Sequence, residues 1–169
     1  MMRTFTTRVA APLLLAATLV ALTGCGALEP TAEPAVRDET SGEITESSEA
    51  DVFSLEVGDC LNETGTEEVT EVSSVPTVPC DQPHDSEAYA ATDMPAGDYP
   101  GDQAVTDASD AYCYEQFATF VGLSYEESTL ELASFFPTQE SWAEGDHEIM
   151  CFIYSPDGQV TGTLAAAAR

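Results

Sequence analysis

The chain has 169 residues, of which 31 are Asp or Glu and only four are Lys or Arg, so its formal net charge is −27 at pH 7. A surface this acidic repels phosphate backbones, which excludes nucleic acid as a partner. It also repels anionic lipid head groups, so we expect the folded part to stand away from the bilayer. Acidity of this kind is more typical of a solubility feature than of a binding site.

The N-terminus is typical of a bacterial lipoprotein. Arg3 and Arg8 form a short positive region before an apolar run over residues 9–22. This run is shorter than the roughly 18 apolar residues that span a membrane. The run ends in Leu22-Thr23-Gly24-Cys25, which has the form of a lipobox. We therefore expect residues 1–24 to be a cleaved signal peptide and Cys25 to carry a diacyl anchor on the extracytoplasmic face of the cell membrane. An ordinary signal peptide cut near Ala27, or an uncleaved anchor, is the alternative.

The next segment, residues 25–56, is predicted to be the lipidated cysteine followed by a tether. Residues 26–54 are rich in Glu, Thr, Ser, Pro, Ala and Asp and hold few large apolar side chains. Such a composition buries too little apolar surface to offset the entropy of ordering, so the tether is expected to be disordered and acidic. Residues 57–169 then form one domain.

The first half of this domain indicates strands. Short apolar or period-two patterns predict strands over residues 57–61 and 68–75, and a weaker one over residues 87–92. Residues 94–101 are dense in turn formers.

A main helix is predicted next, with Asp102 as N-cap and Gly122 as a left-handed residue after its last turn. Its apolar residues recur every three or four positions, which favours a core-facing stripe over a groove for a partner. The stripe consists of Val105, Ala108, Tyr112, Cys113, Phe117, Phe120 and Val121.

The remaining residues predict one short turn of helix, a second short helix and the rest of the sheet. Ser124 to Glu127 form a capping-box pattern, and Thr138 is placed to cap a short helix that Gly145 ends. Strands are expected over residues 130–136 and 149–154, the latter apolar on both faces and so central. A turn over residues 155–158 is expected to return the chain into residues 160–164. The predicted fold class is α+β, a small, mostly antiparallel sheet with one main helix, a short second helix and two disulfides.

Four cysteines remain after Cys25, an even number in an oxidising compartment. Of the three pairings we favour Cys60–Cys80, which brackets the opening strands, and Cys113–Cys151, which joins the helix to the central strand. A zinc site is the rival hypothesis, but the chain has no Cys-x-x-Cys spacing and its two histidines, His84 and His147, lie far apart in sequence. No metal site and no cofactor are therefore predicted.

Several stretches resemble the actinobacterial septum-formation domain family over residues 57–164. The resemblance is carried by Gly58-Asp59-Cys60-Leu61, Val78-Pro79-Cys80-Asp81-Gln82-Pro83-His84-Asp85-Ser86-Glu87, Tyr99-Pro100-Gly101, the helix with Cys113, Tyr125-Glu126-Glu127-Ser128, Pro137-Thr138-Gln139-Glu140-Ser141-Trp142, and Cys151 before Gly162-Thr163-Leu164. It implies an extracytoplasmic domain associated with cell division. It implies no catalytic residue and no cofactor.

One polar site is suggested by the residues themselves. His84 could act as a base or ligand with Asp85 or Glu87 orienting it, and the alternative is a rigid turn in which the imidazole bonds to backbone beside a disulfide. A weak site for divalent cations is a further alternative, with oxygen ligands from Asp98, Asp102, Asp107 and Asp110.

The chain lacks the motifs of common hydrolases: a Gly-x-Ser-x-Gly elbow, a phosphate loop and a His-Glu-x-x-His helix are all missing from it. We therefore expect a non-enzymatic interaction module of the cell envelope or division machinery, with cell-wall or divisome components as partners. A cell-wall hydrolase or a cation-dependent module is the alternative.

Overall fold

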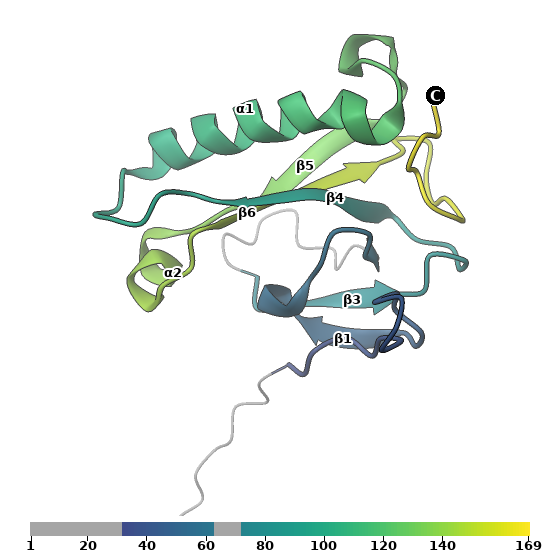
Figure 1. Cartoon of the computed structure of the whole chain (residues 1–169), viewed down its shortest axis with the longest axis horizontal. Coiled ribbons are helices and arrows are strands. Elements are labelled where there is room, and N and C mark those ends of the chain that lie inside the picture. The colour runs from purple at the N-terminus through teal and green to yellow at the C-terminus, as the bar shows by residue number, and fades with distance from the viewer. Residues whose placement is uncertain (1–31, 63–71) are drawn as a thin grey trace, which may run out of the picture.

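The computed structural model describes residues 32–62 and 72–169, which build one antiparallel sheet with a long helix across it (Figure 1). The sheet has six strands in the order β1-β3-β2-β4-β6-β5. The strands are β1 (Ser48–Asp51), β2 (Cys60–Leu61), β3 (Ser74–Val78), β4 (Ser86–Asp93), β5 (Glu131–Phe135) and β6 (Glu148–Tyr154). The helices are α1 (Asp102–Val121), α2 (Gln139–Glu144) and the single 3-10 turns η1 (Val52–Ser54) and η2 (Tyr125–Glu127). The predicted fold class is confirmed.

Strand β6 lies between β4 and β5 and is buried on both faces, as its continuous apolar run predicts. Ile149, Cys151 and Ile153 belong to the core beneath α1. The alternating residues Met150 and Phe152 belong to a second cluster on the opposite face. This two-sided burial explains why the strand has no polar alternation.

Helix α1 covers the first face through a narrow stripe at every fourth position. Val105, Ser109, Cys113, Phe117 and Val121 are its buried residues. The helix ends where Gly122 takes a left-handed conformation with φ of 81°, which a side chain would disfavour. Asp102 is the first helical residue rather than the N-cap, because Gly101 occupies that position with φ of 97°.

The second face is covered by the N-terminal part of the same sheet, which curls back beneath β4 and β6 (Figure 1). Leu55, Leu61 and Val75 from this part pack against Met150 and Phe152. The curl is possible because β2 is only two residues long and pairs with both β3 and β4.

The prediction of a disordered tether through residue 54 is wrong for residues 33–54. Strand β1 pairs with β3 over four residues, and Glu33 bridges to Ala50. Arg37 is held by Asp59 through two hydrogen bonds of 2.5 and 2.6 Å. The sequence pattern missed this segment because strand pairing, a buried ion pair and a small cluster of Ala35, Ile44 and Ala50 hold it in place, with few large apolar side chains.

The predicted signal peptide, residues 1–24, together with Cys25 and residues 26–31, lies outside the described residues, as do residues 63–71. The strand predicted over residues 68–75 falls partly in this gap, and the described strand β3 begins at Ser74. The strand predicted over residues 57–61 is reduced to Cys60–Leu61. The weak prediction over residues 87–92 proves to be β4, the longest described strand.

The predicted return of the chain into a strand over residues 160–164 is also wrong. Strand β6 already pairs with β4 on one side and with β5 on the other, so residues 160–164 have no free edge of β6 to pair with. Val160 instead forms an isolated bridge with His84, and Gly162 donates to the carbonyl of Cys80. This difference carries the C-terminal residues to the loop that precedes β4.

Both predicted disulfides are present. Cys60 is bonded to Cys80 and closes a separation of 20 residues, whereas Cys113 is bonded to Cys151 across 38 residues. The second bond joins α1 to β6 inside the main core, where both cysteines are fully buried.

The short helix α2 begins at Thr138, the N-cap that its sequence predicts, and the structure adds a capping box with Ser141. Thr138 Oγ1 accepts from the backbone N–H of Ser141 at 3.1 Å, and Ser141 Oγ accepts from the N–H of Thr138 at 3.0 Å. We expect Thr138→Ala to lower the free energy of unfolding by about 1 kcal/mol, because it removes the acceptor for an N–H that has no intrahelical partner. Urea titration followed by circular dichroism measures this change.

Ser124→Ala is the matched control, because the Ser124 side chain makes no capping bond to the backbone of η2 and donates to Glu127 instead. It should change stability by less than about 0.5 kcal/mol. Equal losses in the two variants would contradict the role assigned to Thr138.

Candidate functional site

The predicted polar motif lies where the chain enters β4. His84 is fully buried, and its backbone is fixed by two 2.9 Å hydrogen bonds exchanged with Val160. Its ring Nδ1 lies 2.9 Å from the carbonyl oxygen of Gln82. This is the arrangement of the alternative interpretation, a rigid turn in which the imidazole bonds to backbone beside a disulfide.

Glu87 lies on β4 and is 2% exposed. Its carboxylate accepts from Thr163 Oγ1 at 2.6 Å and from the backbone N–H of Leu164 at 2.5 Å. The C-terminal residues that were predicted to return along the sheet therefore supply both hydrogen-bond donors to this buried carboxylate. Charge-assisted hydrogen bonds to both oxygens lower the free-energy cost of burying a carboxylate.

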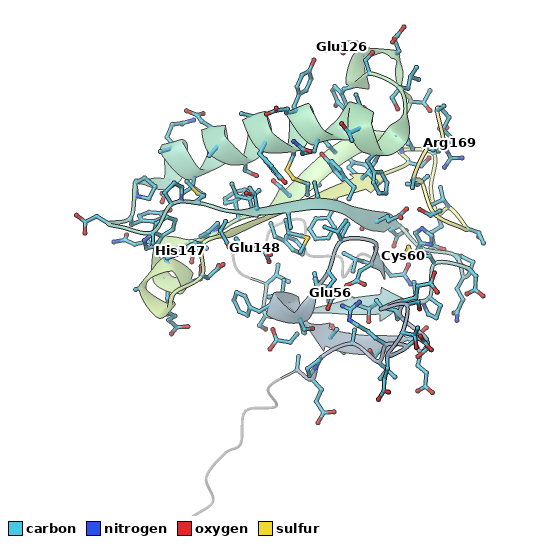
Figure 2. All side chains as sticks on the ribbon, in the orientation of Figure 1. Glu56, Cys60, Glu126, His147, Glu148 and Arg169 are labelled. Atoms are coloured by element: carbon cyan, nitrogen blue, oxygen red, sulfur yellow. A yellow bond between two sulfur atoms is a disulfide. The ribbon has the colours of Figure 1, made fainter. Side chains whose placement is uncertain are left out.

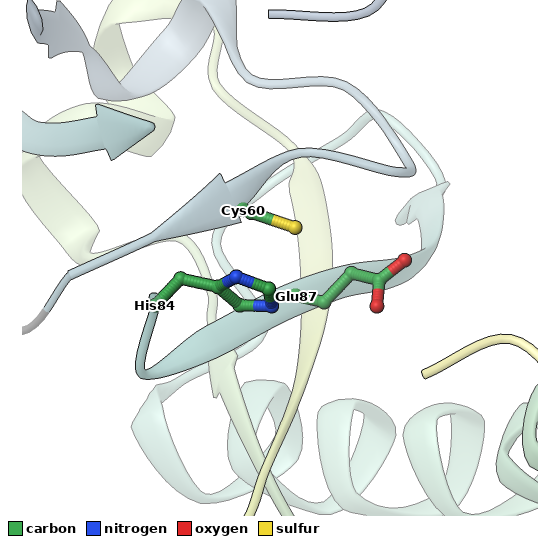
Figure 3. Close-up of side chains that lie close together, drawn as sticks. All are labelled: Cys60, His84 and Glu87. Atoms are coloured by element: carbon green, nitrogen blue, oxygen red, sulfur yellow. The ribbon is translucent and has the colours of Figure 1, made fainter. Parts of the chain in front are cut away.

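The structure brings His84 and Glu87 together with Cys60 (Figure 3). A ring nitrogen, a carboxylate oxygen and the Cys60 sulfur all lie within 4.8 Å of one another. We call these three residues the buried cluster. Asp85, the third predicted member of the site, is half-buried and is not part of it. Cys60 is missing from the sequence-based site because only the sheet, through its pairing with Glu87, places it there.

No opening to solvent reaches the buried cluster, since each of its members is at most 2% exposed. A substrate therefore has no access to His84 or Glu87 in this conformation. The acid–base chemistry considered for His84 finds no support in the geometry.

The aspartates considered for a cation do not converge. Among residues 32–62 and 72–169, the buried cluster is the one group of three or more potential metal-ligating side chains whose atoms lie close together. Asp102 accepts from Tyr99 and Asp107 from Gln103 along the exposed side of α1. These two carboxylates serve local hydrogen bonds.

Two shallow hollows flank α2, with volumes of about 480 and 500 Å³. They share Glu144, Gly145 and His147. The first is rimmed by carboxylates and by Phe53, which is 65% exposed. The second contains an aromatic group in which the Trp142 ring lies 4.3 Å from the His147 ring and 5.6 Å from the Tyr99 ring. The sequence-based site did not include this region, because its members come from four separate segments.

The first hollow concentrates negative charge around Glu148, which Figure 2 shows beside His147. Burial, together with the nearby carboxylates of Asp93 and Asp146, raises the pKa of Glu148. A carboxyl group with a raised pKa in the folded state binds protons more readily there than in the unfolded chain. Its ionised form thus lowers stability, and this loss appears as the pH rises above the ordinary pKa of glutamate, about 4.3.

We therefore expect Glu148→Gln to raise the Tm at pH 7, with the difference from the native protein vanishing below about pH 4, where Glu148 is protonated in both states. Thermal unfolding between pH 3.5 and 7.5 tests this. Glu144→Gln, on the exposed rim of the same hollow, changes the net charge equally and should raise the Tm less. A Glu148→Gln benefit that does not depend on pH would contradict the explanation.

Fold and site together define a small, disulfide-bonded α+β domain in which His84 and Glu87 of the predicted polar site are buried. The family model described as septum formation matches residues 22–151, about three quarters of the chain. The chain therefore belongs to the septum-formation family. No curated protein and no solved structure matches it.

The described residues contain no helix that combines the length and the apolar character needed to cross a membrane. The C-terminal residues 152–169, which lie beyond the family match, include Thr163 and Leu164 that hold Glu87.

Proposed function

We propose that this chain is a lipoprotein, anchored through Cys25 on the extracytoplasmic face of the cell membrane, whose domain binds envelope or division components without catalysing a reaction. The observation that carries the proposal is membership of the septum-formation family, which suggests a role in septum formation and cell division. The match begins at residue 22 and so includes Cys25, the cysteine of the predicted lipobox. An anchor of two acyl chains would hold the domain stably at the membrane.

The state of the polar residues supports binding rather than catalysis. Asp59 is paired with Arg37, Glu87 is held by Thr163 and Leu164, and His84 is enclosed. Catalytic acids and bases need contact with a substrate in a cleft, and these groups have none. The described hollows lie elsewhere, beside α2.

The proposed partner surface is the region around α2, and its charge sets the kind of partner. Asp93, Glu144, Asp146 and Glu148 line the first hollow, and exposed Phe53 adds an apolar contact. A cationic segment of a wall or division component would meet complementary charge there and a neutral one would not be repelled, whereas an anionic polymer would be.

Two experiments test the proposal. Metabolic labelling with a fatty acid should mark the native chain and leave Cys25→Ser unlabelled, and only the native chain should restore normal septa to a deletion strain. An unlabelled native chain would refute the anchor. Complementation by Cys25→Ser equal to the native chain would refute the need for it.

Incubation with purified peptidoglycan separates binding from catalysis. Retention of the protein without soluble fragments supports an interaction module. Release of fragments that scales with protein concentration would instead establish a hydrolase. Glu144→Gln with Asp146→Asn, a variant altered at the rim of the first hollow and, through Glu144, of the second, should weaken retention if this surface makes the contact.

A further inference from the structure

We infer that opening the Cys60–Cys80 disulfide converts the buried cluster into a zinc-binding site. Zinc accepts thiolate sulfur, imidazole nitrogen and carboxylate oxygen, which are the three groups that Cys60, His84 and Glu87 provide. In the oxidised protein the Cys60 sulfur is bonded to Cys80 and is no ligand. The proposal rests on four features of the cluster and does not depend on the proposed function.

The first feature is the state of the His84 ring. Nδ1 lies 2.9 Å from the carbonyl oxygen of Gln82, an atom that can only accept, so Nδ1 carries the proton. Nε2 then has a bare lone pair. Among the buried side-chain nitrogen and oxygen atoms of the described residues, Nε2 is the one without a hydrogen-bond partner. A histidine that donates one ring N–H to a backbone carbonyl and offers the other nitrogen is the usual form of a metal ligand.

The second feature is the set of hydrogen bonds on Glu87. Each carboxylate oxygen accepts one bond, from Thr163 or from Leu164, and each retains a further lone pair. Glu87 can therefore bind a cation without losing either partner. Outer hydrogen bonds of this kind orient carboxylate ligands in metal sites.

The third feature is charge and size. One thiolate and one carboxylate neutralise the two positive charges of Zn²⁺, so the filled site with these three ligands carries no net charge. Zinc bonds of about 2.0–2.3 Å place tetrahedral ligand atoms roughly 3.5 Å apart. The atoms of the buried cluster lie within 4.8 Å, so movements of about 1 Å would close the site.

The fourth feature is the access of a reductant. Cys80 is half-buried, whereas Cys113 and Cys151 are fully buried, so the Cys60–Cys80 bond is the more accessible of the two. A dithiol reductant supplies two electrons and two protons, is itself oxidised to a disulfide, and leaves Cys60 and Cys80 as thiols. Binding of Zn²⁺ then displaces the proton of each thiol that becomes a ligand.

The sharpest test uses Cys80→Ser in the full chain, which frees the Cys60 sulfur without any reductant. Competition with a chromophoric chelator should show one tightly bound Zn²⁺ per chain for Cys80→Ser and none for the oxidised native protein. Adding His84→Gln to Cys80→Ser should weaken zinc binding by more than 100-fold, because a direct ligand is lost. Adding Thr163→Val should weaken it by about 10- to 100-fold, because an outer hydrogen bond to Glu87 is lost.

His147→Gln, added to Cys80→Ser, is the matched control, since it removes the other histidine of the chain and leaves the buried cluster intact. It should not change zinc affinity. Equal affinity of Cys80→Ser and the oxidised native chain would overturn the proposal, as would equal affinity of Cys80→Ser with and without His84→Gln.

If Cys80→Ser does not fold, the reduced native protein gives the answer. Zn²⁺ should then protect the Cys60 thiol from alkylation and raise the Tm, with Co²⁺ producing the absorption of a cobalt–thiolate bond. Alkylation at the same rate with and without Zn²⁺ would overturn the proposal.

Discussion

Arg37→Met is expected to lower the free energy of unfolding by about 3–5 kcal/mol. The Arg37 guanidinium makes two hydrogen bonds to Asp59, and the side chains are only 15% and 4% exposed. The hydrogen bond to Asp59 raises the pKa of Arg37 despite the opposing effect of burial. Removing the guanidinium leaves the Asp59 carboxylate buried, and within residues 32–62 and 72–169 the backbone N–H of Glu56 is its remaining donor. The loss comes mainly from this uncompensated charge.

Urea unfolding of the full chain measures the effect, and two further variants define its cause. Glu56→Gln removes a carboxylate that is 3.8 Å from Arg37 and 64% exposed, so it should cost less than about 1 kcal/mol. Arg37→Met combined with Asp59→Leu removes both charges and should recover most of the stability, because no unpaired charge remains buried. An Arg37→Met variant with an unchanged free energy of unfolding would mean that residues 33–54 are not part of the folded unit.

This pair also shows where sequence reasoning reaches its limit. Arg37 belongs to a segment whose composition predicts disorder, and nothing in a single sequence connects it with Asp59, 22 positions away. The one usable signal is the scarcity of cations: Arg37 is one of only four Lys or Arg residues in the chain. A lone cation in an acidic segment is a better candidate for a specific partner than any of its acidic neighbours.

The elements with strong local signals were predictable. Gly122 and Gly145 end α1 and α2 in left-handed conformations, and the two-sided apolar run of β6 is central in the sheet. The pairing of the cysteines was predictable as well, because a helix stripe that contains Cys113 must face the strand that it covers. These features follow from residues close together in sequence or from one packing rule.

The features that depend on pairing between residues far apart in the sequence were not predictable. Val160 binds to the loop at His84 because both flanks of β6 are occupied, a fact of sheet order that no turn pattern reveals. The candidate site changed for the same reason: His84 and Glu87 were identified from the motif, whereas Cys60 and Thr163 join them only through strand pairing and the C-terminal segment.

Cys113→Ala combined with Cys151→Ala is the second variant with a large expected effect. The disulfide closes 38 residues, which corresponds to about 4 kcal/mol in the chain-entropy model. Both sulfurs also lie in the core with Phe117, Ile149 and Ile153, so their removal leaves unfilled space. We expect a loss of about 4–5 kcal/mol and a fall in Tm of about 15 °C. For a domain whose total stability is about 5–15 kcal/mol, this is a large share.

Cys60→Ala combined with Cys80→Ala is the comparison, because it removes a bond that closes only 20 residues and leaves the core beneath α1 intact. It should cost about 3 kcal/mol. Urea titration measures both losses, and a change in slope would report the less compact unfolded chain that each variant leaves. A Cys113/Cys151 double variant that loses less than about 1 kcal/mol would show that core packing alone holds α1 on the sheet. The Tyr89 and Phe117 rings, whose centroids lie 6.3 Å apart, belong to this packing.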